Sequence, residues 1–264
     1  MSLNISNQKP TLQGLIIQGK RGKLLSTLYI SGGATPRPVI LLFHGIPGNE
    51  QNGDLAQSLR KNGYNVLTFH YSGCFGSDGN YSFANNIEDA ETVLDYVLAD
   101  TEHNFDKNRI YAVGHSLGGF VCSHISAKRA EIKAAALLMP CNIGRIWKVK
   151  EESSAEFENL NNLLSESSEW LADVTKEQFL TELDQNRTTF PLETLAQSLS
   201  KKPVLCIQAT LDDITPPVYH SQPLIDEIKK YPNAIHVTNI ATDHYASDYR
   251  DLLINTVEDF LTAV

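Results

Sequence analysis

One stretch of the chain constrains its fold more than any other. Residues 109–120 read RIYAVGHSLGGF. Residues 110–113 form a short apolar, β-rich run typical of a buried parallel strand, and residues 119–127 have the pattern of a helix. Between the two lies the sequence G-H-S-L-G, whose glycines allow a sharp strand-to-helix turn. We therefore expect Ser116, at the centre of this turn, to stand out at the edge of a sheet.

The surroundings of this serine suit nucleophilic chemistry. The helix that begins at Leu117 directs free N–H groups and the positive end of its dipole to the spot beside Ser116. A nucleophilic serine needs a base, and the base needs an acid to orient it. His244 follows the last expected strand in a short polar loop, from which it is able to reach back over the sheet edge. The loop after the preceding strand offers Asp212 and Asp213 as candidate acids.

Composition and charge exclude several classes of protein. A chain of 264 residues that is 42% hydrophobic and 20% charged is long enough for one α/β domain with a full core. The formal net charge of −9, without a compensating cluster of Lys and Arg, argues against nucleic acid as a partner. Neither a secretory leader nor an apolar run of membrane-spanning length is recognisable. We expect a cytoplasmic protein without membrane association, either a monomer or a homodimer, with a small molecule as its partner.

Cysteines and histidines give no sign of a metal site or a disulfide framework. The four cysteines lack C-x-x-C spacing, and we expect them to be reduced. None of the eight histidines forms an H-x-x-x-H pair with an acidic neighbour. The sequence predicts neither a metal ion nor a cofactor.

Strands and helices alternate along most of the chain, which predicts a parallel sheet with right-handed crossovers. The first two strands, joined by a glycine-containing turn, are expected to form an antiparallel hairpin. Helices are expected over residues 54–62 and 85–98, after Ser116, and from the histidine loop to Phe260. The expected strands comprise residues 12–18, 23–30, 39–43, 64–69, 110–113, 134–139, 203–209 and 234–240.

One segment differs from the rest in composition. Residues 142–202 are rich in Glu, Ser and Asn, with aromatic and aliphatic side chains at helical spacing. The segment is too long for a plain connection, so it predicts a helical insertion into a core domain of residues 1–141 and 203–264. Because it leaves from the carboxyl end of a strand, we expect it to cover the site as a lid. The alternative is an insertion elsewhere on the surface.

These motifs together resemble the α/β-hydrolase family, in its esterase and prolyl-oligopeptidase-like branch. The resemblance extends from the turn at His44 to His244. Two positions depart from the family pattern: Ala209 stands where glycine is usual, and His70 where an aspartate often begins the turn. The matching motifs are HGIPG (44–48), G-x-x-G-x-x-G (73–79), GHSLGG (114–119), Asp212 four residues before Pro216, and Asp243-His244.

The resemblance implies an α/β-hydrolase fold, with a mostly parallel eight-stranded sheet, and a serine mechanism. Ser116 attacks an acyl carbonyl, His244 takes its proton, and Asp212, favoured over Asp213 by its spacing from the proline, orients the histidine. The backbone N–H groups of Ile46 and Leu117 are expected to form the oxyanion hole. The residues expected to border the substrate pocket are His44, Gly45, Cys74, Phe75, His115, Cys141 and Trp147.

Three functions remain open from the sequence. A carboxylesterase for small molecules, including feruloyl and cinnamoyl esters, agrees best with the short insertion. A peptidase or amidase related to prolyl oligopeptidases is less favoured, because the chain lacks a large gating domain. A non-catalytic binding protein on the same fold is the third, and the intact set of serine, aspartate and histidine argues against it.

Overall fold

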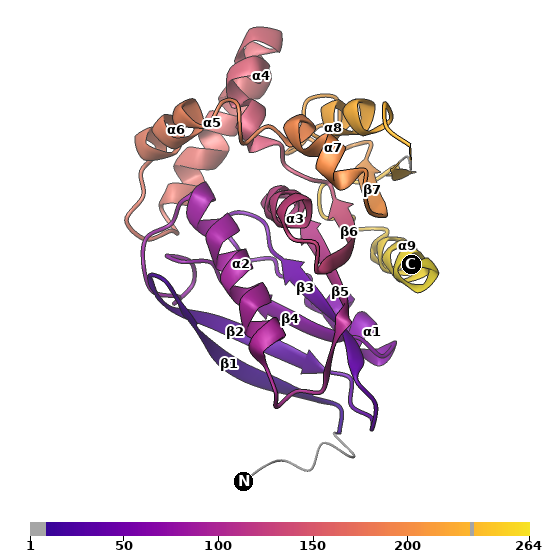
Figure 1. The fold of residues 1–264 in the computed structure, drawn as a ribbon. Helices are drawn as coiled ribbons and strands as arrows, with labels where there is room; N and C mark the ends of the chain where they lie inside the picture. The colour runs from indigo at the N-terminus through magenta and orange to yellow at the C-terminus, as the bar shows by residue number, and fades with distance from the viewer. Residues whose placement is uncertain (1–8, 233–234) are drawn as a thin grey trace.

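A single eight-stranded sheet runs through the molecule in the order β1-β2-β4-β3-β5-β6-β7-β8, with helices on both faces (Figure 1). The computed structural model describes residues 9–232 and 235–264. β2 pairs antiparallel with both of its neighbours, and β4, β3, β5, β6, β7 and β8 pair in parallel. The strands are β1 (Thr11–Gly19), β2 (Gly22–Ile30), β3 (Arg37–Phe43), β4 (Asn65–Phe69), β5 (Phe105–His115), β6 (Ile132–Leu138), β7 (Val204–Ala209) and β8 (His236–Ile240).

This sheet confirms the predicted topology and corrects its details. The hairpin closes at Gly19 and Gly22, as expected. β5 begins at Phe105, five residues before the apolar run. Phe105 pairs with Arg37 of β3, and the continuous pairing of the two strands starts at Val39 and Ile110. The last strand was expected to start at Ala234, which lies outside the described residues.

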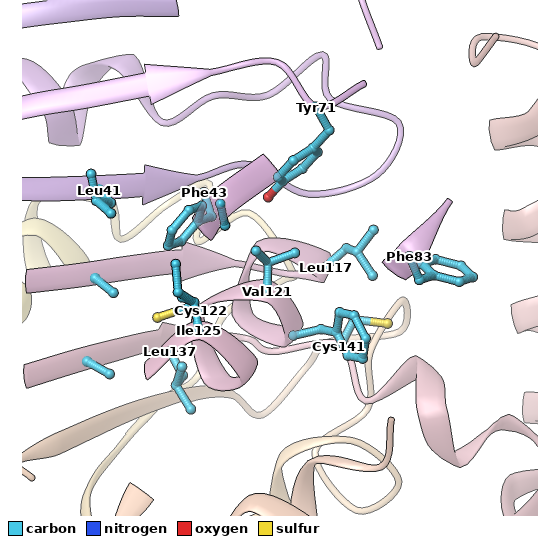
Figure 2. Packing of buried hydrophobic residues seen from close by; sticks show 14 of the residues in the cluster. Leu41, Phe43, Tyr71, Phe83, Leu117, Val121, Cys122, Ile125, Leu137 and Cys141 are labelled. Carbon is cyan, nitrogen blue, oxygen red and sulfur yellow. The ribbon is translucent and has the colours of Figure 1, made fainter. Parts of the chain in front are cut away.

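Alternation along β3 explains why its sequence is apolar without interruption. Ile40 and Leu42 point to the face covered by α1 (Gly53–Lys61) and α9 (Arg250–Ala263). Leu41 and Phe43 point to the face covered by α2 (Phe83–Ala99), α3 (Leu117–Lys128) and α8 (Ser221–Ile228). Figure 2 shows Leu41 and Phe43 packed beside the side chains of α3. Both faces of the strand are therefore buried, as in a doubly covered parallel sheet.

The segment 142–202 is helical, as its composition predicts. It contains α4 (Ile146–Glu152), α5 (Ser154–Ser168), α6 (Lys176–Gln185) and α7 (Ala196–Leu199), with the 3-10 turns η2 (Ile143–Arg145) and η3 (Leu192–Leu195). α4, α5 and α6 lie together beyond the carboxyl ends of the strands (Figure 1). η3 and α7 instead pack against α3 and α8 and continue the helical layer of the core.

Specific contacts attach this segment to the loop that follows β4. Ala172 donates a backbone hydrogen bond to Gly73 O at 2.8 Å, and Tyr81 donates one back to Ala172 O at 3.0 Å. Glu182 of α6 accepts hydrogen bonds from the first amides of α2, Phe83 N at 3.0 Å and Ala84 N at 2.7 Å. Those amides have no partner inside their own helix, so Glu182 caps α2 from the insertion.

All four cysteines are buried, and none is paired with another in the described structure. In the part of the chain that the structure describes, no helix combines the length and the apolar character needed to cross a membrane.

Candidate active site

Ser116 occupies the turn between β5 and α3 in a conformation that few non-glycine residues adopt. Its φ is 56° and its ψ is −123°, a strained combination that the surrounding structure must hold in place. A Cβ atom on Gly114 would lie 2.0 Å from Gly118 O, and one on Gly118 would lie 2.1 Å from Phe43 O. Both glycines are therefore required by close backbone packing, and the serine is fixed at the sheet edge.

Asp212 and His244 form a buried pair beside this turn. His244 Nδ1 donates to Asp212 Oδ2 at 2.8 Å. The other carboxylate oxygen, Oδ1, accepts from the amides of Ile214 at 2.9 Å and Thr215 at 2.7 Å. Burial alone raises the pKa of the Asp212 carboxyl, but the contacts with His244 and Thr215 outweigh it and leave the pKa below its ordinary value. Asp212 is thus an ionised carboxylate that orients the His244 ring.

Thr215 is a third member of this group that the sequence analysis missed. Its hydroxyl lies 2.9 Å from Asp212 Oδ2, 3.1 Å from His244 Nδ1 and 3.2 Å from Met139 O. The hydroxyl connects the pair to the end of β6 and restricts the rotation of both side chains. Its position three residues after the aspartate, typical of a side-chain-capped turn, was the available signal.

Of the two adjacent aspartates, only Asp212 contacts the histidine in the described structure. Asp213 is exposed and lines the larger of the two cavities at the site. The geometry therefore agrees with Asp212 as the orienting acid.

Ser116 and His244 both line a small cavity of about 40 Å³, together with Gly45, Ile46 and His115. Among the described residues, no hydrogen bond links the Ser116 hydroxyl to the His244 ring. Such contacts are often long in a site without substrate and tighten when substrate binds. The arrangement places a serine and an oriented imidazole at the wall of the same space.

His115 supports the histidine loop rather than the reaction centre. Its Nε2 donates to the backbone oxygen of His244 at 2.9 Å. Burial lowers the pKa of the His115 imidazole to about 3, helped by the nearby His244. His115 is therefore neutral at ordinary pH and acts as a hydrogen-bond donor.

The two backbone amides predicted to form the oxyanion hole have no hydrogen-bond partner among the described residues. They are the N–H groups of Ile46 and Leu117. Ile46 follows Gly45, which lies directly behind the serine: a Cβ atom there would be 3.0 Å from Ser116 Cβ. His44 fixes this turn, because its Nδ1 donates to Gly45 O at 2.7 Å and its own carbonyl accepts from the Tyr71 hydroxyl at 3.2 Å.

A larger cavity of about 660 Å³ adjoins the small one and shares Ile46 with it. One face of α5, with positions spaced three or four residues apart, forms one of its walls. The opposite wall comes from the loops after β3, β4, β7 and β8. The lining residues are Ile46, Pro47, Asn49, Phe75, Asn159, Asn162, Leu163, Glu166, Ser167, Trp170, Asp213, Ile214 and Tyr245.

Several predicted pocket residues lie away from both cavities. Gly45, His115 and Phe75 line one or the other. Cys141 is buried in the hydrophobic core near Leu117 and Phe83 (Figure 2). Trp147 packs near Phe157, with ring centres 6.1 Å apart, and the Arg187 guanidinium lies 4.7 Å from the Trp147 ring centre. The aromatic residue of the 142–202 segment that lines the cavity is Trp170, in the turn that follows α5.

His44 and Cys74 belong to a buried cluster behind the cavity wall. With His70, their nitrogen and sulfur atoms lie within 4.8 Å of one another, a proximity that the spacing in sequence does not reveal. The Cys74 thiol donates to Pro47 O at 3.0 Å, and burial raises its pKa to about 12. The thiol is therefore protonated and participates in the hydrogen bonding of the turn.

Comparison with known proteins agrees with this architecture. A family described as alpha/beta hydrolase fold matches residues 38–251, from β3 to the start of α9. The chain belongs to the alpha/beta hydrolase fold family. Lysophosphatidylserine lipase ABHD12 from Xenopus tropicalis is 34% identical to this hydrolase over 102 residues, and the protein from Rattus norvegicus is 33% identical over 101 residues. These matches cover 37% of this chain and only 25% and 24% of those relatives.

Solved structures share the fold of this hydrolase at low sequence identity. Est1E from Butyrivibrio proteoclasticus with bound ferulic acid has a TM-score of 0.70 and 18% identity, over 94% of this chain and 98% of that one. The Pyrococcus furiosus esterase Pf2001 has a TM-score of 0.70 and 16% identity, over 96% and 93% of the two chains. GrgF from Penicillium sp. sh18 has a TM-score of 0.72 and 14% identity, over 96% and 98%.

Proposed function

We propose that this alpha/beta hydrolase cleaves carboxylic esters of small molecules through an acyl-enzyme on Ser116. The observation that carries the proposal is the strained Ser116 turn beside a buried, hydrogen-bonded Asp212–His244 pair, at the wall of a common cavity. The adjoining cavity of about 660 Å³ is of a size that binds small molecules.

The geometry supports a double-displacement mechanism. His244 takes the proton of the Ser116 hydroxyl as its oxygen attacks the ester carbonyl, and Asp212 and Thr215 hold the ring so that Nε2 faces the serine. The resulting imidazolium returns the proton to the leaving alcohol. Water then attacks the acyl-enzyme with the same histidine as base, which releases the carboxylic acid and restores Ser116.

We assign to the free backbone amides of Ile46 and Leu117 the role of donating hydrogen bonds to the carbonyl oxygen as negative charge develops on it. One such donor is worth roughly 10²- to 10³-fold in rate in enzymes of this type. Because both contacts come from the main chain, substitutions of the Ile46 side chain should leave much of the turnover intact.

The comparisons favour ester chemistry over other reactions of the fold. Two of the similar structures are called esterases or bind ferulic acid, and the relatives with similar sequence are called lipases. We assign α4, α5 and α6 the role of a lid, since α5 forms a wall of the cavity and the three helices lie beyond the strand ends.

The test is a series of p-nitrophenyl esters of increasing acyl length, with a feruloyl ester included, on the wild-type protein and on Ser116→Ala. We expect turnover by the wild type and a loss of about 10⁴-fold or more in the variant. The length profile would measure the depth of the cavity. Equal turnover by Ser116→Ala would overturn the mechanism. A folded protein that cleaves anilides but no ester would be an amidase, and one that cleaves neither would be a binding protein.

A further inference from the structure

Carboxylates line the cavities beside Ser116, and the nearby Arg250, which donates to Tyr245 O at 3.0 Å, is paired with Asp54 outside the lining. Glu166 and Asp213 line the larger cavity, and Glu50 lines the smaller one. Among the described residues that line the two cavities there is no lysine or arginine. Glu166 and Asp213 form no ion pair with any other described side chain. These two carboxylates are therefore free to interact with a bound molecule.

Aromatic rings from three separate segments line the same space. Trp170 is 67% exposed, Tyr245 44% and Phe75 39%, and all three line the larger cavity. Exposed aromatic side chains that converge on one cavity indicate a ligand-contact surface. Burial raises the pKa of the Tyr245 phenol, and the charges of Glu50 and Asp213 contribute in the same direction. Tyr245 therefore lies close enough to the carboxylates of Glu50 and Asp213 to feel their charge.

Ser167 is a buried polar residue at the wall of the same cavity. It is only 1% exposed, it lines the larger cavity, and its hydroxyl has no hydrogen-bond partner in the described structure. A buried hydroxyl without a partner costs free energy unless something else satisfies it. Ser167 lies next to Glu166 on α5, at the same wall of the cavity.

We propose that the larger cavity selects esters that carry a positively charged ammonium group in the part of the molecule beyond the scissile carbonyl. This inference rests on the proposed esterase function and specifies its substrate class. Aromatic faces attract an ammonium group through their quadrupoles, and the carboxylates of Glu166 and Asp213 attract it through charge. An ester with a phosphate or carboxylate in the same place is repelled by both.

The expected preference is moderate, because Glu166 and Asp213 are exposed and solvent screens their charge. Cation–aromatic contacts of about 0.5–2 kcal/mol correspond to roughly twofold to thirtyfold in affinity or in kcat/KM. We expect the cationic ester to exceed its neutral counterpart by a factor in this range, and the anionic ester to fall below both.

The experiment compares three butyrate esters of equal size: the choline ester, its uncharged 3,3-dimethylbutyl counterpart, and a 3-carboxypropyl ester. A second set places the same three groups at the end of the acyl chain. The readout is the ratio of kcat/KM between cationic and neutral esters, at low and high salt. A ratio of one or less in both sets would overturn the proposal.

Matched variants test whether the residues that line the larger cavity cause the preference for the cationic ester. Glu166→Gln should lower the ratio about threefold, whereas Glu158→Gln, an exposed carboxylate on the same helix that lines neither cavity, should leave it unchanged. Trp170→Leu should lower the ratio as well. Equal ratios in Glu166→Gln and Glu158→Gln would show that overall protein charge, not this cavity, causes the preference.

Calorimetry separates this proposal from the esterase function. Ser116→Ala is titrated with choline and, separately, with 3,3-dimethylbutanol at millimolar concentrations. Tighter binding of choline supports the cationic cavity even if no ester is cleaved, in which case only the proposed reaction fails. Equal binding, or preference for the neutral alcohol, contradicts the proposal whether or not esters are cleaved.

Discussion

Ser116 and Trp170 line two adjoining cavities, and the segments that hold them differ in packing and polarity. The serine lies among strands β3, β5 and β6, where an added methyl group at either flanking glycine would meet backbone atoms. The tryptophan follows α5, a helix that buries one narrow face, including Leu160 and Leu164, in the core and leaves the rest of its surface partly or fully exposed. On the proposed mechanism, the core therefore fixes the reacting groups, whereas the 142–202 segment shapes the cavity that substrate enters.

The largest effect that tests this comparison comes from two adjacent carboxylates. Asp212→Asn leaves the His244 ring without its charged partner and favours the wrong tautomer, so we expect kcat to fall by about 10³- to 10⁴-fold. Asp213→Asn changes only the cavity wall, and kcat for a neutral ester should stay within about threefold of wild type. Ester kinetics of the two variants check this expectation. A large loss of kcat in Asp213→Asn alone would show that Asp213, and not Asp212, orients His244.

A methyl group at Gly118 should destabilise the protein, because no space is available for it between α3 and β3. The Cβ of Gly118→Ala would lie 2.1 Å from Phe43 O, so the β3–α3 contact must open. We expect a loss of about 3 kcal/mol or more in the free energy of unfolding, measured by urea denaturation. Gly53→Ala, where the nearest atom would be 3.8 Å away, is the control and should change stability by less than about 1 kcal/mol. Similar losses in both variants would contradict the packing account.

The buried histidines of the core predict how stability depends on pH. Burial lowers the pKa of His44 and of His115 to about 3, well below the ordinary value of 6.5. Between pH 6.5 and 3 the unfolded chain therefore binds more protons than the folded one, and stability falls as the pH falls. Each histidine contributes at most about 1.4 kcal/mol per pH unit in this range.

Denaturation at pH 7, 6 and 5 checks this dependence. His115→Gln should lose less stability between pH 7 and pH 5 than the wild type, by about 2 kcal/mol at most. His236→Gln, at an exposed position on β8, should lose as much as the wild type. A His115 variant with the full pH dependence would show that this imidazole is not held neutral.

The smallest expected effect concerns the attachment of the insertion. Glu182→Ala removes the carboxylate that accepts from Phe83 N and Ala84 N, at a cost of about 1 kcal/mol in stability. Glu177→Ala, exposed on the same helix, should cost less stability than Glu182→Ala. Urea denaturation of both variants measures the difference. Equal stability of the two variants would mean that the cap does not stabilise the insertion.

Residues close together in sequence account for what could be predicted. The β-turn-α pattern around Ser116 and the apolar run of β3 follow from local spacing, so the sheet and the serine turn were predictable. Contacts between segments that are distant in sequence were not predictable. Thr215 beside His244, Glu182 at the start of α2, and the His44–His70–Cys74 cluster depend on how loops meet in space.

The wall of the cavity gives the clearest example of this limit. Trp147 and Trp170 have similar settings in the sequence, since both stand in helical patterns of the insertion. The structure turns Trp147 toward Phe157 and Arg187, and places Trp170 at the cavity. The packing of α4 and α6 against α5 decides which residues of this segment face the cavity. The helical spacing of apolar residues does not reveal how these helices pack.

The central claim is that Ser116 is the nucleophile, and covalent labelling tests it most directly. A fluorophosphonate reacts with a serine that an adjacent imidazole activates, and the phosphonylated residue is then located by peptide mass mapping. We predict one adduct per chain, on Ser116, that forms far more slowly in His244→Ala and is absent from Ser116→Ala. Labelling at another residue, or no labelling of the folded wild-type protein, would contradict the account.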